Sequence, residues 1–343
     1  MVNKTISMNL VCLILTLLIS ISCNKNENAT HQNNIDLQGI NAKFISNATY
    51  DIYDETKFDI WLPSSQIPTG LLIYIHGGGF TSGDKSDVFE NDKWDFPSEI
   101  RTLLSNNIAV ASINYRLLEQ NGENEGIIKC LYDSKRFLQY IRYNSKTYNI
   151  DKSKIVLAGT SAGAGTALWL GVNNNLNDSL NTDPVLREST RVKALALRET
   201  QSTYNLEDRW INDVFIDYGI TWNDFLSSFQ DRIFKLYGVT NLIDYENTTI
   251  DTYRNTVDML ELITPDDPEM FVENILTKVQ APNTSGKANH HAFHAREIKK
   301  KADLVGINNV CYYGKNPIIY SDPSGETYLE FVIRKINEKK IVK

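Results

Sequence analysis

The sequence predicts an α/β protein with one mainly parallel, eight-stranded sheet that is flanked by helices and carries a helical insertion. Short apolar runs rich in β-branched residues alternate with segments whose apolar residues recur at helical spacing, a pattern typical of parallel strands. The alternation stops at about residues 199–262, where the chain is aromatic-rich and helical in pattern. With 343 residues, 42% of them hydrophobic, the chain has enough apolar material for a large core.

The charge balance and the cysteines narrow the class of protein further. A net charge of −7 provides no basic face, so we expect no nucleic-acid partner. The four cysteines show no pairing pattern. Cys130 and Cys311 fall in a predicted helix and a predicted strand, where we expect buried free thiols.

Residues 1–22 have the pattern of a signal peptide. Lys4 precedes the apolar run Leu10–Ile21, which is too short to span a bilayer. The stretch Ser20-Ile21-Ser22-Cys23 resembles the cleavage site of bacterial lipoprotein signals, and this resemblance implies that Cys23 becomes the lipidated first residue. An ordinary secretory peptide cut nearby is the alternative. Both interpretations predict export, and the first predicts a lipid anchor in a bacterial membrane, at the periplasmic face or the cell surface.

The segment after the leader is polar and rich in asparagine. Residues 23–40 contain almost nothing that could be buried, so we expect a flexible tether between the lipid anchor and the folded part. Residues 41–343 then form the folded domain, with the helical insertion at about 199–262 as a cap.

The eight strands follow from apolar runs of strand length, and helical spacing fills the gaps between them. The predicted strands are Thr49–Tyr53, Lys57–Leu62, Leu71–His76, Ile108–Tyr115, Lys154–Ala158, Val192–Leu197, Met270–Glu273 and Asn309–Tyr313. The predicted covering helices are residues 96–105, 126–143, 163–172, 291–306 and 328–337.

The fifth predicted strand ends in the stretch Gly159-Thr160-Ser161-Ala162-Gly163, with a small-residue apolar helix directly after it. This is the pattern of a nucleophile elbow, a strand-to-helix turn so tight that only small residues fit beside the serine. The turn directs the Ser161 hydroxyl into a cleft at a helix N-terminus, which favours developing negative charge. Ser161 is therefore the candidate nucleophile.

Within the insertion, one helix has clear boundaries in the sequence. Thr221 and Asp224 have the spacing of a capping box, and Gly238 is a stop signal. One stripe of this helix is apolar: Trp222, Phe225, Leu226, Phe229, Ile233 and Tyr237. The stripe is typical of core packing, and in an insertion it could also roof the active site and shape an acyl pocket. The two interpretations are compatible.

Several motifs in a fixed order resemble the hormone-sensitive-lipase branch of the α/β-hydrolases over most of the mature length. In chain order they are His76-Gly77-Gly78-Gly79-Phe80, Gly83-Asp84-Lys85-Ser86, Asn114-Tyr115-Arg116-Leu117, Asp133, Asp151, Gly159-Thr160-Ser161-Ala162-Gly163 and Pro265-Asp266-Asp267-Pro268. The resemblance implies an α/β-hydrolase fold and hydrolysis of carboxylic esters through an acyl-enzyme on Ser161.

The resemblance also assigns the oxyanion hole. It implies that the backbone N–H groups of Gly78, Gly79 and Ala162 stabilise the oxyanion, and glycines after a strand suit such an approach of the backbone to the substrate. His76 is a candidate for the catalytic base because it precedes this loop, but the resemblance implies that its role is structural.

The last third of the chain departs from this pattern. The branch places an aspartate after the seventh strand and a histidine after the eighth, whereas residues 274–289 contain no acid and residues 314–321 contain no histidine. This departure matters because a serine hydroxyl is a weak nucleophile without a neighbouring base.

The histidines left in the predicted fold, apart from His76, are His290, His291 and His294. One interpretation is a helix start on the surface. A second is that His290 or His291 reaches Ser161 from an unusual loop, with Glu199 after the sixth strand as the acid. A third is a metal site, because His290 and His294 have i,i+4 spacing, although no acidic ligand accompanies them. We expect no metal and no cofactor.

The sequence is compatible with two functions. The first is a serine esterase that removes short acyl or acetyl groups from a small-molecule or glycan-linked ester. The second is a pseudo-hydrolase that keeps the elbow and the oxyanion loop while it binds a ligand or partner without turnover, because the histidine and the aspartate are missing from their expected positions.

Overall fold

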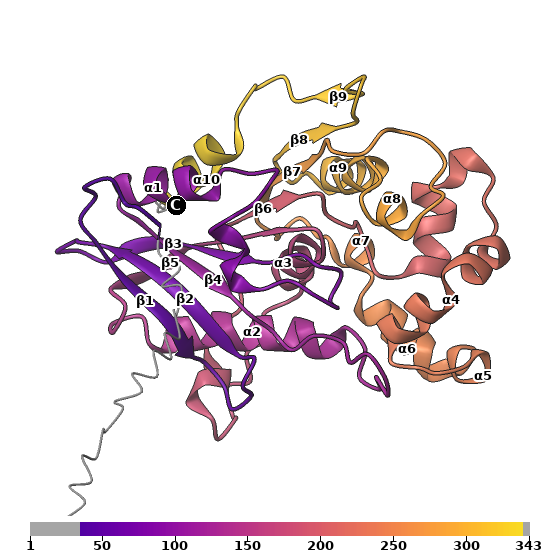
Figure 1. Cartoon of the computed structure of the whole chain (residues 1–343), viewed down its shortest axis with the longest axis horizontal. Coiled ribbons are helices and arrows are strands. Elements are labelled where there is room, and N and C mark those ends of the chain that lie inside the picture. Colours follow the sequence, from indigo (N-terminus) through magenta and orange to yellow (C-terminus); the bar gives the residue numbers. More distant parts are fainter. Residues whose placement is uncertain (1–34, 339–343) are drawn as a thin grey trace, which may run out of the picture. The chain divides into compact units, whose positions relative to one another are not determined.

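The computed structural model describes residues 35–338, which form a nine-stranded sheet with helices on both faces (Figure 1). The strand order is β1-β2-β4-β3-β5-β6-β7-β8-β9, with β3 to β8 parallel and β1, β2 and β9 antiparallel to their neighbours. The strands are β1(Ala42–Thr49), β2(Lys57–Pro63), β3(Thr69–Ile75), β4(Ile108–Ile113), β5(Ile150–Thr160), β6(Ala194–Arg198), β7(Glu269–Asn274), β8(Asn309–Tyr313) and β9(Tyr320–Ser321). The predicted mainly parallel α/β sheet is confirmed.

The two ends of the sheet differ from the prediction. The first strand is β1, not Thr49–Tyr53, and its residues are half-buried or exposed, so it has no apolar run by which to recognise it. It pairs with β2 across an irregularity between Ile45 and Ala48. At the other edge, the two-residue β9 adds a ninth strand to the expected eight.

The helices form a layer on each face of the sheet. One core packs α1 and α10 against the sheet, and the other packs α2, α3 and α9 against the opposite face. Residues of β3 alternate between the two cores, with Leu71 and Ile73 in one and Leu72 and Tyr74 in the other, as the twofold period of a strand requires. These helices are α1(Phe96–Ser105), α2(Ile128–Tyr143), α3(Ala162–Val172), α9(Phe293–Val305) and α10(Tyr328–Asn337). Cys130 and Cys311 are buried free thiols, as predicted.

All elements between β6 and β7 are helical, as expected for the cap, and Figure 1 shows α4, α5 and α6 gathered at one end of the sheet. They are η3(Leu206–Val214), η4(Ile216–Tyr218), α4(Trp222–Tyr237), α5(Leu242–Tyr245), α6(Thr248–Thr256) and α7(Met259–Leu262). The predicted capping box of Thr221 and Asp224 begins α4, and Gly238, at a φ of 70°, ends it. The helix is interrupted at Phe229, whose φ of −135° is not helical. Shorter elements are η1(Lys85–Val88), η2(Pro184–Arg187) and α8(Ser285–Asn289).

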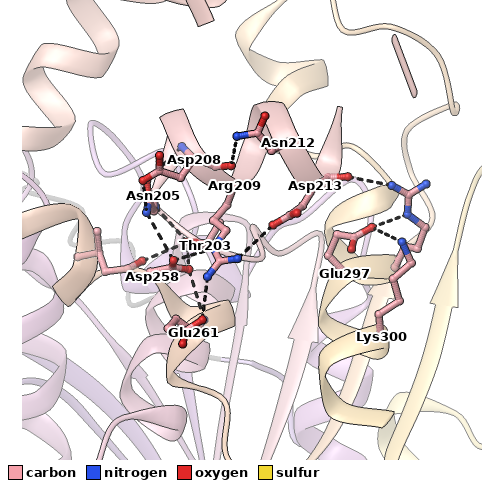
Figure 2. A network of polar contacts seen from close by, with 12 residues as sticks. Thr203, Asn205, Asp208, Arg209, Asn212, Asp213, Asp258, Glu261, Glu297 and Lys300 are labelled. Carbon is pink, nitrogen blue, oxygen red and sulfur yellow. Dashed lines mark hydrogen bonds and ion pairs between the residues drawn. The ribbon is translucent and has the colours of Figure 1, made fainter. Parts of the chain in front are cut away.

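A polar network fixes the base of the cap (Figure 2). The guanidinium of Arg209 on η3 binds the buried carboxylate of Asp258 and the exposed carboxylate of Glu261, each at 2.8 Å. From α9, Arg296 donates to the carbonyl of Asp213 at 3.1 Å and pairs with Glu297. Removing one partner of such a buried pair leaves an uncompensated charge, so the network holds η3 against α7 and α9.

Part of the predicted N-terminal organisation lies outside the described residues: the leader, Cys23 and most of the tether. Across residues 35–338, no helix combines the length and the apolar character that a bilayer span requires.

Candidate active site

Ser161 lies at the tip of a sharp turn between β5 and α3, as the elbow pattern predicts. Its φ of 56° and ψ of −123° are rarely adopted by residues with a side chain, and they raise the serine above the sheet. The turn is crowded, because a Cβ on Gly159 would collide with the backbone of Gly163, and one on Gly163 with that of Ile75. The N–H of Ser161 donates to the carbonyl of Arg198 at 2.9 Å, so β6 fixes the turn as well.

His290 lies beside this serine, with 2.7 Å between its Nε2 and the Oγ of Ser161. It belongs to the loop between α8 and α9, so it follows β7 rather than β8. Burial, and then the positive charges of Lys93 and Arg232, lower the pKa of His290 to about 4. The ring is therefore neutral near pH 7, the state in which an imidazole accepts a proton from a hydroxyl.

The loop after β3 presents unpaired backbone donors next to Ser161. Gly78 and Gly79 have φ values of 96° and 61°, and a side chain on Gly78 would collide with the backbone of Ser82. Among residues 35–338, no protein acceptor binds the N–H groups of Gly78, Gly79 or Ala162, the first residue of α3. Free, fixed N–H groups beside a nucleophile are what an oxyanion requires.

The residues around this loop hold it in place. His76 is buried, stacks on Tyr115 with ring centroids 4.4 Å apart, and lies 2.8 Å from the carbonyl of Gly77 through its Nδ1. Asn114 donates to Asp84 at 2.6 Å in the following turn. The contacts of His76 are those of a side chain that holds the loop in place, which agrees with the expectation that it is not the base.

Glu199 follows β6 directly and reaches the neighbouring strand end. Its Oε1 accepts the N–H groups of Ile275 at 2.8 Å and Leu276 at 2.9 Å, so its carboxyl group lies directly after β7, where residues 274–289 contain no acid of their own. Its Oε2 is buried without a hydrogen-bond partner in the described part of the chain. Burial raises the pKa of Glu199 to about 7, against the opposing effect of the two N–H donors. The φ of 52° adds backbone strain, which often marks a functional residue.

His291 and His294 have other partners and anchor the loop that carries His290. The Nδ1 of His291 accepts the N–H of Phe293 at 3.2 Å, so its Nε2 carries the hydrogen and donates to the carbonyl of Gln280 at 3.2 Å. The Nδ1 of His294 accepts the N–H of Ser202 at 3.2 Å, and its Nε2 donates to the carbonyl of Ala288 at 3.0 Å.

These placements separate the three interpretations of the histidine cluster. The histidines do not form a surface helix start, because His291 and His294 are fully buried. His290 contacts Ser161, whereas His291 does not. The rings of His290 and His294 bind different partners, and within residues 35–338 no three side chains are grouped as metal ligands.

The buried histidines predict a loss of stability in acid. Burial lowers the pKa of His291 to about 4 and that of His294 to about 3, below the value near 6.5 in an unfolded chain. Their stabilising contribution is complete above pH 6.5 and declines as the pH falls towards 4, because only the unfolded chain then takes up protons. We expect each ring to cost about 2 kcal/mol of unfolding free energy between pH 7 and pH 5.

Urea unfolding at several pH values measures this dependence. The His294→Asn variant keeps a donor and an acceptor but does not titrate, so its unfolding free energy should fall less steeply with acid than that of the wild type. Equal slopes for the two proteins would contradict the prediction.

Ser161 borders two spaces of different character. A cavity of about 50 Å³ lies under the cap, lined mostly by apolar side chains that include Phe80, Leu118, Trp210, Phe225, Phe229 and Ile233. An open groove of about 520 Å³ also borders Ser161 and is more polar, with Asp87, Asn91, Lys93, Trp94, Glu199 and His290 in its wall. The apolar stripe of α4 therefore serves both predicted purposes, because Phe225 and Ile233 are buried in the core and also line the cavity.

The structure adds two residues that the sequence did not suggest. Arg232 borders the cavity and the groove, and Lys93 borders the groove. Neither residue belongs to a motif that would predict a functional role, and in the sequence alone each would be expected to be a solvated surface charge.

Comparisons with solved structures define the class of fold. A truncated form of a carbohydrate esterase from gut microbiota superposes with a TM-score of 0.57 at 16% identity, covering 87% of this chain and 96% of that one. The acetyl ester-xyloside bifunctional hydrolase from Caldicellulosiruptor lactoaceticus gives a TM-score of 0.54 at 17% identity, covering 83% of this chain and 89% of that one. With the sheet order and the elbow, these neighbours show that the chain has the α/β-hydrolase fold, as predicted.

Sequence comparisons point to esterases within that class. The family model BD-FAE, an α/β-hydrolase esterase family, matches residues 58–214. Acetylcholinesterase-1 of Trittame loki is 30% identical over 127 residues, 34% of this chain and 21% of that protein. Chlorogenic acid esterase of Aspergillus niger is 30% identical over 124 residues, 34% of this chain and 23% of that protein. The chain thus spans about a fifth of the length of these relatives, and the hormone-sensitive-lipase branch stays a prediction.

Proposed function

We propose that the protein is a serine carboxylesterase that removes short acyl groups, above all acetyl, from polar alcohols through an acyl-enzyme on Ser161. The observation that carries the proposal is the 2.7 Å contact between the Ser161 hydroxyl and the neutral ring of His290. The pseudo-hydrolase alternative rests on a missing histidine and a missing aspartate, and the contact of His290 with Ser161 weakens the first of these two reasons.

The proposed reaction has two halves. His290 Nε2 takes the Ser161 proton while Oγ attacks the ester carbonyl carbon, and the N–H groups of Gly78, Gly79 and Ala162 stabilise the oxyanion. The imidazolium then protonates the leaving alcohol, and the acyl group stays on Ser161. In the second half, His290 deprotonates a water molecule that attacks the acyl carbonyl. When the tetrahedral intermediate collapses, the bond between Oγ and the acyl carbon breaks and the imidazolium returns its proton to Oγ, so the carboxylic acid leaves and the serine is restored.

Glu199 is the acid of this proposal. It shares the groove with Ser161 and His290, and its unpaired Oε2 is a buried acceptor without a donor among the described residues. In the proposed triad, the carboxylate of Glu199 orients the imidazole of His290 and stabilises its protonated form. The proposed triad therefore takes its acid after β6 and its base after β7, each one strand earlier than the resemblance implies.

The two spaces beside Ser161 suggest the substrate. A cavity of roughly 150 Å³ accommodates benzene, so about 50 Å³ suits an acyl chain of about two carbons. The larger polar groove suits a hydrophilic alcohol, and Trp94 adds an aromatic side chain to its wall. The names of the structural neighbours, a carbohydrate esterase and an acetyl ester-xyloside hydrolase, support a glycan-linked ester as the substrate class.

A series of 4-nitrophenyl esters tests the proposal. We expect kcat/KM to be highest for the acetate and about 100-fold lower for the octanoate, because the cavity under α4 cannot hold the longer chain. The Phe229→Ala variant enlarges this cavity and should shift the preference towards the butyrate. Absence of hydrolysis for every ester would overturn the function, and an equal rate on the octanoate would overturn the acetyl preference.

We also propose that the protein is exported and lipid-anchored through Cys23. The support is the leader pattern alone, namely the short apolar run and the Ser20-Ile21-Ser22-Cys23 stretch.

A further inference from the structure

Two cations border the groove next to Ser161 without a carboxylate partner. Lys93 lies between η1 and α1, and Arg232 lies on α4 of the cap. No ion pair joins either of them to an acid in the part of the chain that the structure describes. By contrast, Arg209 of the cap is paired with two carboxylates, those of Asp258 and Glu261.

Arg232 is nevertheless held at a defined place. Its guanidinium lies so close to the Cα of Gly79 that a side chain there would collide with it. With its amide oriented to donate to the carbonyl of Ser285 at 3.2 Å, Asn289 accepts a hydrogen bond from Arg232 at 3.1 Å. The positive charge therefore lies between the oxyanion loop and the loop that carries His290.

The acids near the groove leave these charges available. Asp87 accepts the N–H of Asp84 at 3.3 Å in the cap of η1. Glu199 binds the N–H groups of Ile275 and Leu276, and the charge of Lys93 lowers the pKa of Glu199 without an ion pair between the two side chains. Asp92 lies exposed on the rim and pairs with neither Lys93 nor Arg232. An anion can thus approach both cations from the open side of the groove.

We propose that Arg232 and Lys93 form a subsite for a carboxylate on the alcohol part of the substrate, so that the enzyme acts on acyl esters of sugar acids. This inference rests on the proposed esterase function. The carboxylate belongs to the alcohol, because Lys93 borders the groove and not the small apolar acyl cavity. A guanidinium binds a planar carboxylate with two parallel hydrogen bonds, and a nearby ammonium adds a point charge.

Such a substrate would assist the chemistry as well as the binding. In the free protein, Lys93 and Arg232 disfavour the imidazolium that His290 must become during the reaction. A bound carboxylate offsets these two charges at the moment when His290 carries the proton. The anionic substrate should therefore gain in kcat and not in KM alone.

The test compares two substrates that differ only at C6 of the sugar, an acetylated methyl glucuronoside with a carboxylate there and the same acetyl ester of methyl glucoside with a hydroxymethyl group. For the wild type at low salt, we expect kcat/KM to be at least 10-fold higher for the acid, and the ratio to fall as salt is added. In Arg232→Gln and in Lys93→Gln the ratio should approach one. The control Lys287→Gln removes a positive charge from α8, outside both spaces, and should keep the wild-type ratio.

Inhibition of 4-nitrophenyl acetate hydrolysis provides a second readout that does not require turnover of a sugar ester. Free methyl glucuronoside should inhibit the wild type more strongly than methyl glucoside, and the two variants should lose this difference. A wild-type ratio near one, or a ratio unchanged in both variants, would overturn the carboxylate subsite while leaving the esterase intact. Failure to hydrolyse any ester would instead overturn the proposed function.

Discussion

We expect the Ser161→Ala variant to hydrolyse 4-nitrophenyl acetate with a kcat lower by about 10⁴-fold or more. The loss is large because the substitution removes the atom that forms the acyl-enzyme, and the oxyanion donors alone supply only a small remainder of the catalysis. The fold should be unaffected, since alanine keeps the Cβ and deletes only the hydroxyl at the tip of the elbow. Steady-state kinetics and thermal unfolding of the same preparations measure both expectations.

An exposed serine on β5, the strand that leads to the elbow, provides the matched control. Ser153 lies near the start of β5, is exposed, and binds Asp151 at 2.7 Å. The Ser153→Ala variant should keep full activity. Wild-type activity in Ser161→Ala would exclude the elbow serine as the nucleophile.

The second large effect is expected at His290. Replacing it with glutamine should lower kcat by about 10³-fold or more, because Ser161 loses the group that takes its proton. KM should change little, since the ring contributes to the reaction more than to binding. Glu199→Gln should lower kcat less than His290→Gln does, by about 10²-fold, because the substitution keeps the shape of the side chain but removes the charge that stabilises the imidazolium.

His291→Gln is the control for this experiment. His291 is the adjacent residue and is more buried, but it binds Tyr218 and Gln280 instead of Ser161. This variant should lose stability while the folded fraction keeps most of its kcat. If His291→Gln abolishes catalysis and His290→Gln does not, the assignment of the base is wrong.

Structural features that depend on residues close together in the sequence could be predicted, including the residues that form them. The elbow and the glycine loop depend on tight turns that only small residues permit, and α4 begins and ends at Thr221 and Gly238 because the capping residues are adjacent in sequence. The edge strand β1 could not be predicted, because all of its residues are half-buried or exposed and it lacks an apolar run.

The choice of base depended on tertiary contacts. Three histidines within five residues are equivalent in the sequence, and their roles separate only through partners far along the chain. His294 binds Ser202, 92 residues earlier, and His291 binds Tyr218, 73 residues earlier, and these anchors leave His290 to face Ser161. Glu199 could be named from its position after β6, but its link to Ile275 at the end of β7 is a product of the fold.

The place of Lys93 and Arg232 at the groove could not be predicted from the sequence either, because it also depends on tertiary contacts. Arg232 is one polar residue on a helix whose apolar stripe determines its packing, and Lys93 belongs to a polar loop. Their common position beside Gly79 and Ser161 arises only when the cap folds over the sheet.

Covalent labelling with a fluorophosphonate, followed by peptide mass spectrometry, tests the central claim most directly. An activated serine attacks the phosphorus and keeps the phosphonyl group, so the labelled peptide identifies the nucleophile. We expect one adduct, on Ser161, that is absent from Ser161→Ala, forms far more slowly in His290→Gln and forms normally in folded His291→Gln. No adduct on the folded wild type, or an adduct on another residue, would contradict it.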